Sequence, residues 1–203
     1  MTSREADPPA FPVVALVCSV GGADALMRVL APLPVDFPAA VVALQHLDPH
    51  HASLLTARLA AATALEVRTA EEGARLCAGV VDVCPPGRHV LLARDDRLLL
   101  VDSSDRPSPR PSADLLLTSM AALLGPRLLA VVLTGHGADG AVGAQVVTRY
   151  GGRTLAQDED SSQSYGMPGA TAAADSPGAP VPLDDLAGVI TDQVRSLLST
   201  GKQ

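Results

Sequence analysis

A serine, a histidine and an aspartate (Ser19, His46 and Asp139) each stand shortly after a run of apolar residues. A serine hydroxyl is a weak nucleophile at neutral pH unless a histidine accepts its proton. The imidazole in turn needs a carboxylate to fix its tautomer and to stabilise its charged form. The chain supplies one residue of each type. Their order along the chain differs from the familiar orders of such triads, but a triad is defined by geometry and roles rather than by order.

The apolar runs that precede these residues predict strands buried on both faces. They span 13–18, 39–44 and 128–133, and each is short, continuous and ended by polar residues or glycines. Such runs are typical of parallel strands covered by helices on both sides. Ligands of these sheets bind outside the carboxyl ends of the strands, so Ser19, His46 and Asp139 are expected to meet at one edge.

The rest of the chain predicts an α/β fold, with a mostly parallel, doubly wound sheet, helices on both faces and a small antiparallel hairpin region. Short segments separated by turn residues predict the hairpin region, and Ser112 with Asp114 is expected to cap a helix. The predicted hairpin segments are 65–68, 80–84, 89–93 and 98–101. The predicted helices are 23–30, 51–62, 115–124, 141–150 and 183–198, and a further strand is 153–156.

Composition limits the class of protein. The chain has 203 residues, of which 47% are hydrophobic, enough for one domain with a substantial core. A net charge of −7 and the lack of any basic block argue against nucleic acid as a partner. No apolar run approaches the roughly 20 residues that span a bilayer, and no signal peptide precedes the first strand. We therefore expect a cytoplasmic protein without membrane insertion, in which 1–12 is a disordered leader and 13–200 a single catalytic domain.

Each candidate residue also has a purely structural interpretation. Ser19 could merely cap the helix that follows it, because Val17 replaces the first glycine of the G-x-S-x-G nucleophile motif. Asp139, before a glycine, could likewise cap a helix, and a single histidine at a strand end is often structural. The coincidence of all three residues favours the catalytic interpretation.

A metal site is the weaker alternative. His46, Asp48, His50 and His51 are close in sequence, but Pro49 interrupts the helix that would align them. The three cysteines include no C-x-x-C pair and are expected to be reduced thiols. We expect neither a metal nor another cofactor.

Six segments, in order, resemble the signatures of the chemotaxis protein-glutamate methylesterase (CheB) catalytic domain family. Each motif alone is weak, but six in register are specific. The segments are Ser19–Gly22, Gln45–His46, Cys84–His89, Pro111–Asp114, Leu133–Gly140, and the stretch from Gln157–Asp158 through Gly166–Pro168.

The resemblance implies an activity and partners. The family hydrolyses methyl esters of receptor glutamates, and can deamidate receptor glutamines, with a Ser-His-Asp triad on an α/β fold. By position, Ser19 is the nucleophile, His46 the base and Asp139 the acid. The implied partners are a methylated chemoreceptor or similar protein substrate and a separate regulator, because the 12-residue leader cannot contain the family's receiver domain. The implied substrate- and oxyanion-binding residues are Val20, Gly21, Gly22, Gln45, His136, Gly137 and Met167.

Two departures from the family pattern affect the site. The family usually has threonine after the nucleophile, where this chain has Val20, and methionine where this chain has His136. The backbone N–H of His136, the family's oxyanion donor, survives the side-chain change. His136 also competes with His46 for the role of base, but it shares a tight turn with Asp139 and is poorly placed to bridge that residue and Ser19. A non-catalytic docking module of the same fold is the alternative function.

Overall fold

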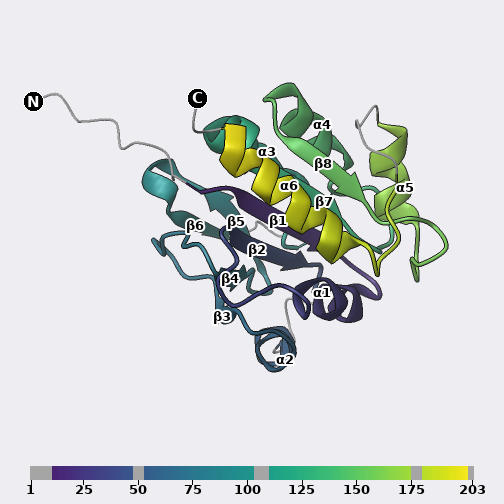
Figure 1. Ribbon diagram of the computed structural model, residues 1–203, viewed down its shortest axis with the longest axis horizontal. Helices are drawn as coiled ribbons and strands as arrows, with labels where there is room; N and C mark the ends of the chain where they lie inside the picture. The colour runs from purple at the N-terminus through teal and green to yellow at the C-terminus, as the bar shows by residue number, and fades with distance from the viewer. Residues whose placement is uncertain (1–10, 48–52, 103–109, 175–179, 201–203) are drawn as a thin grey trace, which may run out of the picture.

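The computed structural model describes residues 11–47, 53–102, 110–174 and 180–200, and its centre is a six-stranded parallel sheet (Figure 1). The strand order is β3-β4-β2-β1-β7-β8. Most of the predicted leader lies outside the described residues. The strands are β1 Val13–Cys18, β2 Ala40–Gln45, β3 Glu66–Thr69, β4 Val80–Val83, β7 Leu128–Val132 and β8 Arg153–Ala156.

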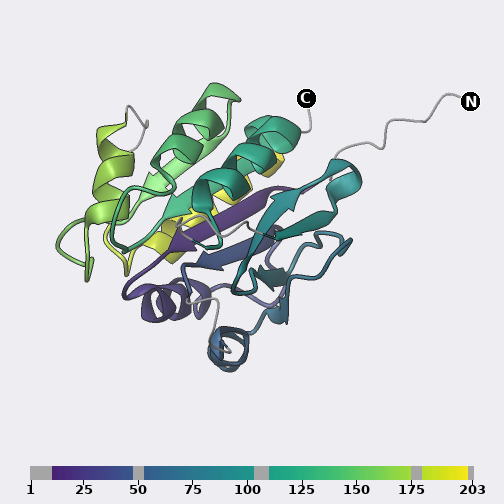
Figure 2. The ribbon, with the colours of Figure 1, turned by 180° about the vertical axis from the view of Figure 1, so that it is seen from behind.

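Helices cover both faces of the sheet, as predicted. Successive residues of β1 point to opposite faces, so Val14 and Leu16 join one buried cluster while Val13 and Ala15 join the other. Helices α1 (Gly22–Leu30), α2 (Leu55–Ala62) and α6 (Leu186–Thr200) pack on the first face. Helices α3 (Ala113–Leu124) and α4 (Ala141–Arg149) cover the second, seen from behind in Figure 2, and α5 (Gly166–Ala173) reaches it through Met167.

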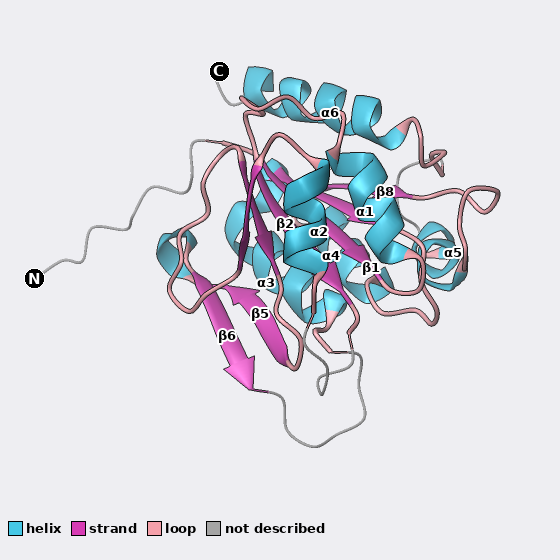
Figure 3. Cartoon of the chain, turned by 90° about the horizontal axis from the view of Figure 1, so that it is seen from below, coloured by secondary structure: helices cyan, strands magenta, loops and turns pink. Residues whose placement is uncertain are grey.

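A two-stranded antiparallel hairpin, β5 (Arg88–Leu92) and β6 (Leu98–Asp102), stands beside the main sheet and packs against α3 (Figure 3). Short 3₁₀ turns cover Arg94–Asp96 and Gly125–Arg127. The hairpin confirms the prediction for the segments 89–93 and 98–101. The prediction is wrong for 65–68 and 80–84, which form β3 and β4 and pair in parallel. All four residues of β4 are buried, because this strand lies between β2 and β3 in the sheet. The turn residues between β3 and β4 belong to the connection that links these two parallel strands.

Each predicted helix differs from the observed one in at least one of its bounds; α6, for example, is Leu186–Thr200 and not 183–198. α3 begins two residues early, at Ala113, because the Ser112 hydroxyl caps it by accepting the N–H of Leu115 at 3.4 Å. α2 begins at Leu55, and the predicted residues 51–52 lie outside the described part of the chain. α5 has no counterpart in the prediction. No helix in the described ranges combines the length and apolar composition needed to cross a bilayer.

The strand order creates a switch point at β1. The chain proceeds from β1 to β2 on one side and later from β7 to β8 on the other, so β2, β1 and β7 are neighbours in the sheet. Crevices at the carboxyl ends of strands beside such a reversal are the usual ligand sites of open α/β sheets. Ser19, His46 and Asp139 follow these three strands.

Candidate active site

Ser19 stands on the sharp turn between β1 and α1. Its N–H donates to the carbonyl of Thr134 at 2.9 Å, and its own carbonyl accepts the Gln45 side-chain amide at 3.2 Å. The N-cap of α1 is Gly21, with φ +77°, and no side chain caps this helix. Within the described residues, the Ser19 hydroxyl makes no hydrogen bond. The capping role considered for Ser19 is therefore absent, and its hydroxyl is available to a substrate.

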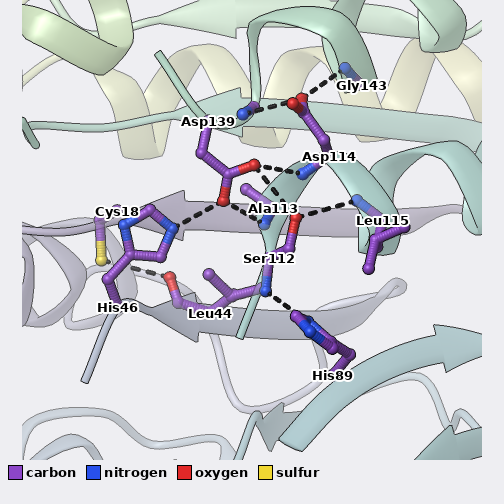
Figure 4. Close-up of polar contacts among 11 residues, drawn as sticks. Cys18, Leu44, His46, His89, Ser112, Ala113, Asp114, Leu115, Asp139 and Gly143 are labelled. Carbon is purple, nitrogen blue, oxygen red and sulfur yellow. Dashed lines mark hydrogen bonds and ion pairs between the residues drawn. The ribbon is translucent and has the colours of Figure 1, made fainter. Parts of the chain in front are cut away.

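His46 and Asp139 form a hydrogen-bonded pair (Figure 4). The His46 Nε2 lies 2.8 Å from Asp139 Oδ2, and the side chains are only 13% and 9% exposed. His46 directly follows β2, and its backbone N–H donates to the Cys18 carbonyl at 3.0 Å. The last backbone bond between β1 and β2 thus places His46 beside the turn that carries Ser19.

The Asp139 carboxylate accepts hydrogen bonds from four groups. Oδ2 accepts His46 Nε2 and the N–H of Ala113 at 2.7 Å, while Oδ1 accepts the Ser112 hydroxyl at 3.1 Å and the N–H of Asp114 at 3.0 Å. Three of these groups are at the first turn of α3, whose partial positive charge favours an anion. Asp139 does cap a helix, but that helix is α3 and not the α4 that follows it in sequence.

These contacts fix the ionisation of Asp139 and the tautomer of His46. Burial alone would raise the pKa of Asp139, but the hydrogen bonds from His46 and from the N–H groups of Asp114 and Ala113 outweigh it and lower the pKa below the usual value. The carboxylate is ionised at neutral pH, so His46 Nε2 must donate to it. The Nδ1 atom of the neutral ring then keeps a lone pair that can accept a proton.

Ser19 lies beside His46 across two paired strands. The register of β1 and β2 pairs Cys18 with Gln45, so the next residues are Ser19 and His46. Neighbouring strands are about 4.8 Å apart. Among the described residues, no hydrogen bond joins the Ser19 hydroxyl to the His46 ring. Catalytic hydrogen bonds are often long or poorly aligned without substrate, so the lack of this bond does not exclude the pair from a triad.

The turns after β1 and β7 carry backbone N–H groups that have no hydrogen-bond partner among the described residues. Within the described residues, the N–H groups of Val20, Gly21, His136 and Gly137 make no hydrogen bond, whereas that of Gly22 donates to the Ser19 carbonyl at 3.0 Å. N–H groups left open around a nucleophile can stabilise an oxyanion. The arrangement thus offers donors from two separate turns.

The turn after β7 is in close contact with Ser19. A Cβ added at Gly135 would lie 2.8 Å from the Ser19 Cβ and 2.3 Å from the Met167 sulfur. Met167 is fully buried under this turn, so it supports the turn from below. Only glycine fits at residue 135 without displacing the serine.

Two residues that the sequence did not single out, Thr134 and Gln157, hold the same turn in place. The Thr134 hydroxyl donates to the Val20 carbonyl at 3.0 Å, and its N–H donates to the Gln157 side-chain oxygen at 2.9 Å. Gln157 is fully buried and also donates to the Ser161 carbonyl at 2.7 Å. Both belong to motifs that carried the family resemblance, which was the available signal.

His136 and His89 occupy different surroundings from His46. His136 is exposed, and its Nδ1 lies 2.7 Å from the Ser164 hydroxyl. His89 of β5 is buried and accepts the N–H of Ser112 through Nδ1 at 3.1 Å. Burial, with the charge of Arg110, lowers the pKa of His89, which keeps the ring neutral and able to accept. Of the three histidines in the described ranges, only His46 is hydrogen-bonded to Asp139.

Within the described ranges, no group of three His, Cys, Asp or Glu side chains is arranged to hold a metal ion. Of the histidine cluster considered for a metal, Asp48, His50 and His51 lie outside these ranges.

The comparisons with known proteins all point to one family. Residues 14–190 match the family model of the CheB methylesterase. The protein-glutamate methylesterase FrzG of Myxococcus xanthus is 42% identical over 167 residues, which cover 82% of this chain and 50% of that protein. A protein-glutamate methylesterase/protein-glutamine glutaminase of Saccharophagus degradans is 37% identical over 175 residues, covering 86% of this chain and 48% of that protein. The chain thus spans about half the length of these relatives.

The fold is also that of a solved relative. The crystal structure of the Thermotoga maritima CheB methylesterase catalytic domain superposes with a TM-score of 0.85 at 30% identity, covering 91% of this chain and 99% of that domain. The resemblance carried by the six sequence segments is confirmed, and so is the predicted α/β fold. On the match over residues 14–190 and on these relatives, the chain belongs to the CheB methylesterase family.

Proposed function

We propose that this protein is a serine carboxylesterase that hydrolyses glutamate γ-methyl esters on chemoreceptors or similar signalling proteins, with Ser19, His46 and Asp139 as its triad. The observation that carries the proposal is the 2.8 Å contact between His46 and Asp139 beside an unengaged Ser19 hydroxyl. Family membership supports the ester as the substrate class.

The geometry suggests the following reaction. Asp139 holds the Nε2–H of His46, and Nδ1 takes the proton of Ser19 as its oxygen attacks the ester carbonyl. The tetrahedral intermediate collapses to an acyl-enzyme as its bond to the methoxy oxygen breaks, and His46 gives the proton to that oxygen, which leaves as methanol. Water then attacks the acyl-enzyme with the help of His46, which releases the glutamate carboxylate and restores Ser19.

The oxyanion of the intermediate needs donors aimed at it. We assign this role to the N–H groups of Val20 and His136, on the turns after β1 and β7, which have no partner among the described residues. Gly21 and Gly137 have further open N–H groups at the same turns, and Gln45 orients the turn through the Ser19 carbonyl. The same acyl-enzyme would form from a glutamine carboxamide with ammonia as leaving group, which matches the double name of the Saccharophagus degradans relative.

The proposed setting is the cytoplasm, with a methylated chemoreceptor as protein substrate and a separate regulator as second partner. The cysteines support a reducing compartment, since Cys18, Cys77 and Cys84 are all free thiols. Burial strongly raises the pKa of the Cys18 thiol, so this neighbour of Ser19 remains protonated and does not act as the nucleophile.

Release of methanol from a methylated receptor peptide tests the proposal. We expect turnover by the wild type and loss of turnover in Ser19→Ala, with an unchanged circular dichroism spectrum, because a half-buried hydroxyl without a hydrogen bond adds little to stability. A wild type that binds the peptide without releasing methanol would instead identify a docking module. Near-normal turnover by Ser19→Ala would exclude Ser19 as the nucleophile.

A further inference from the structure

Two carboxylates, Asp114 and Asp139, cap each other's helices (Figure 4). Asp139 precedes α4 and accepts N–H groups from the start of α3. In return, Asp114 in the first turn of α3 accepts N–H groups from the start of α4. Its Oδ1 lies 2.8 Å from the Gly140 nitrogen and 2.7 Å from the Gly143 nitrogen. The two helix starts are therefore tied together by an exchange of caps.

This exchange is electrostatically unfavourable for Asp114. Burial raises the pKa of Asp114, and the charge of Asp139 raises it further, against the lowering effect of the hydrogen bonds from Gly143 and Gly140. Placing two like charges close together is unfavourable, so the contact must have a compensating benefit. That benefit is the capping of α4: its N-cap, Gly140, has no side chain to accept the N–H groups at the start of the helix, and Asp114 accepts two of them.

We propose that Asp114 is a positioning residue for the reaction: by capping α4 through one carboxylate oxygen, it fixes the backbone that presents Asp139 to His46. This inference rests on the proposed esterase function. Asp139 is bonded directly to Gly140, whose φ is +104° and whose N–H is held by Asp114. A shift of this peptide moves the Asp139 side chain away from His46.

The cap requires an oxygen at one place rather than a charge. Both N–H groups point to the same atom, Oδ1. An asparagine offers an amide oxygen at this place without the charge, whereas a glutamate retains the charge but moves its oxygens by one methylene. Asp114→Asn and Asp114→Glu therefore separate position from charge, and Asp114→Ala removes both.

Steady-state hydrolysis of the methylated receptor peptide tests this inference, with Val147→Ala as control. Val147 is a buried core residue of α4 away from the caps, so this variant loosens the helix without touching the site. We expect Asp114→Glu and Asp114→Ala to lower kcat by about 100-fold with little change in KM, because a displacement of about 1 Å in catalytic geometry has an effect of that order. Asp114→Asn should have a kcat close to that of the wild type. Val147→Ala should also keep the wild-type kcat, even when its melting temperature falls as far as that of Asp114→Glu or Asp114→Ala.

Three results would overturn the inference. They are a kcat in Asp114→Glu equal to the wild type, an Asp114→Asn variant as slow as Asp114→Glu, or a loss of kcat in Val147→Ala that matches its loss of stability. If Asp114→Ala does not fold, the kcat values of Asp114→Asn and Asp114→Glu still test the positioning role of Asp114. A wild type without any turnover would refute the proposed function itself, which is a different outcome from active enzyme with an indifferent Asp114.

Discussion

At the scale of single residues, the surroundings of each side chain decide what it can do. The types Ser, His and Asp after three apolar runs predicted that Ser19, His46 and Asp139 would lie at one edge of the sheet, and the structure joins His46 to Asp139. The sequence could not show that Asp139 accepts four donors or that α3 supplies three of them, because those contacts join elements far apart in the chain. Nor could it show the buried partner of Ser112, the ring of His89.

The two candidate bases should respond differently to substitution. We expect His46→Ala to lose several orders of magnitude in kcat, as removal of a triad member does. His136→Met should retain most activity, because the His136 side chain contacts Ser164 and not Asp139, and its backbone N–H is unaffected. Methanol release by both variants, with circular dichroism to check folding, measures this. An active His46→Ala together with an inactive His136→Met would transfer the role of base to His136.

At the scale of elements, the predictable parts were those with a strong local pattern. Central strands β1, β2 and β7 are continuous apolar runs, and α6 carries its buried stripe of Leu186, Ile190, Val194 and Leu197 as predicted. β3 and β4 were misassigned because short strands between turn residues look the same whether they pair in parallel or antiparallel. α5 was missed because Gly166 and Pro168 at its start resemble a loop, while packing on Gly135 and Gly137 holds it.

The close packing of the turn after β7 gives a direct test at this scale. Gly135→Ala places a methyl group against Ser19 and Met167, so the nucleophile must move, and we expect kcat to fall by about 100-fold. Gly188→Ala in α6 is the matched control, because no atom lies within 4 Å of its added Cβ. It should leave activity and stability unaltered or raise stability slightly. Peptide hydrolysis and urea denaturation measure both variants, and equal activity in the two would show that the turn tolerates a side chain.

At the scale of the whole molecule, stability and the site are linked through the hairpin. His89 of β5 accepts the N–H of Ser112, and Ser112 in turn donates to Asp139. The pKa of His89 is lowered from its ordinary value of 6.5 by burial and by Arg110, partly opposed by Asp139. Between that lowered pKa and 6.5, the unfolded chain binds more protons than the folded one. The contribution of His89 to stability therefore decreases as the pH falls below about 6.5.

Replacing His89 isolates this contribution. His89→Asn keeps an acceptor for the N–H of Ser112 but cannot be protonated. We expect the free energy of unfolding of the wild type to fall more than that of His89→Asn between pH 7.5 and pH 5.5, as measured by urea denaturation. All other residues are the same in the two proteins, so their contributions cancel in the comparison. Parallel curves for the two proteins over this range would show that His89 does not titrate differently on folding.

The central claim is that Ser19 is a nucleophile activated by His46. Its most direct test is labelling with a fluorophosphonate probe, which reacts only with an activated serine, followed by mass spectrometry of the digested protein. We predict a single adduct on Ser19 in the wild type, no adduct in Ser19→Ala, and labelling slowed by orders of magnitude in His46→Ala. An unlabelled wild type that is fully folded, or an adduct on another serine that persists in Ser19→Ala, would contradict the account.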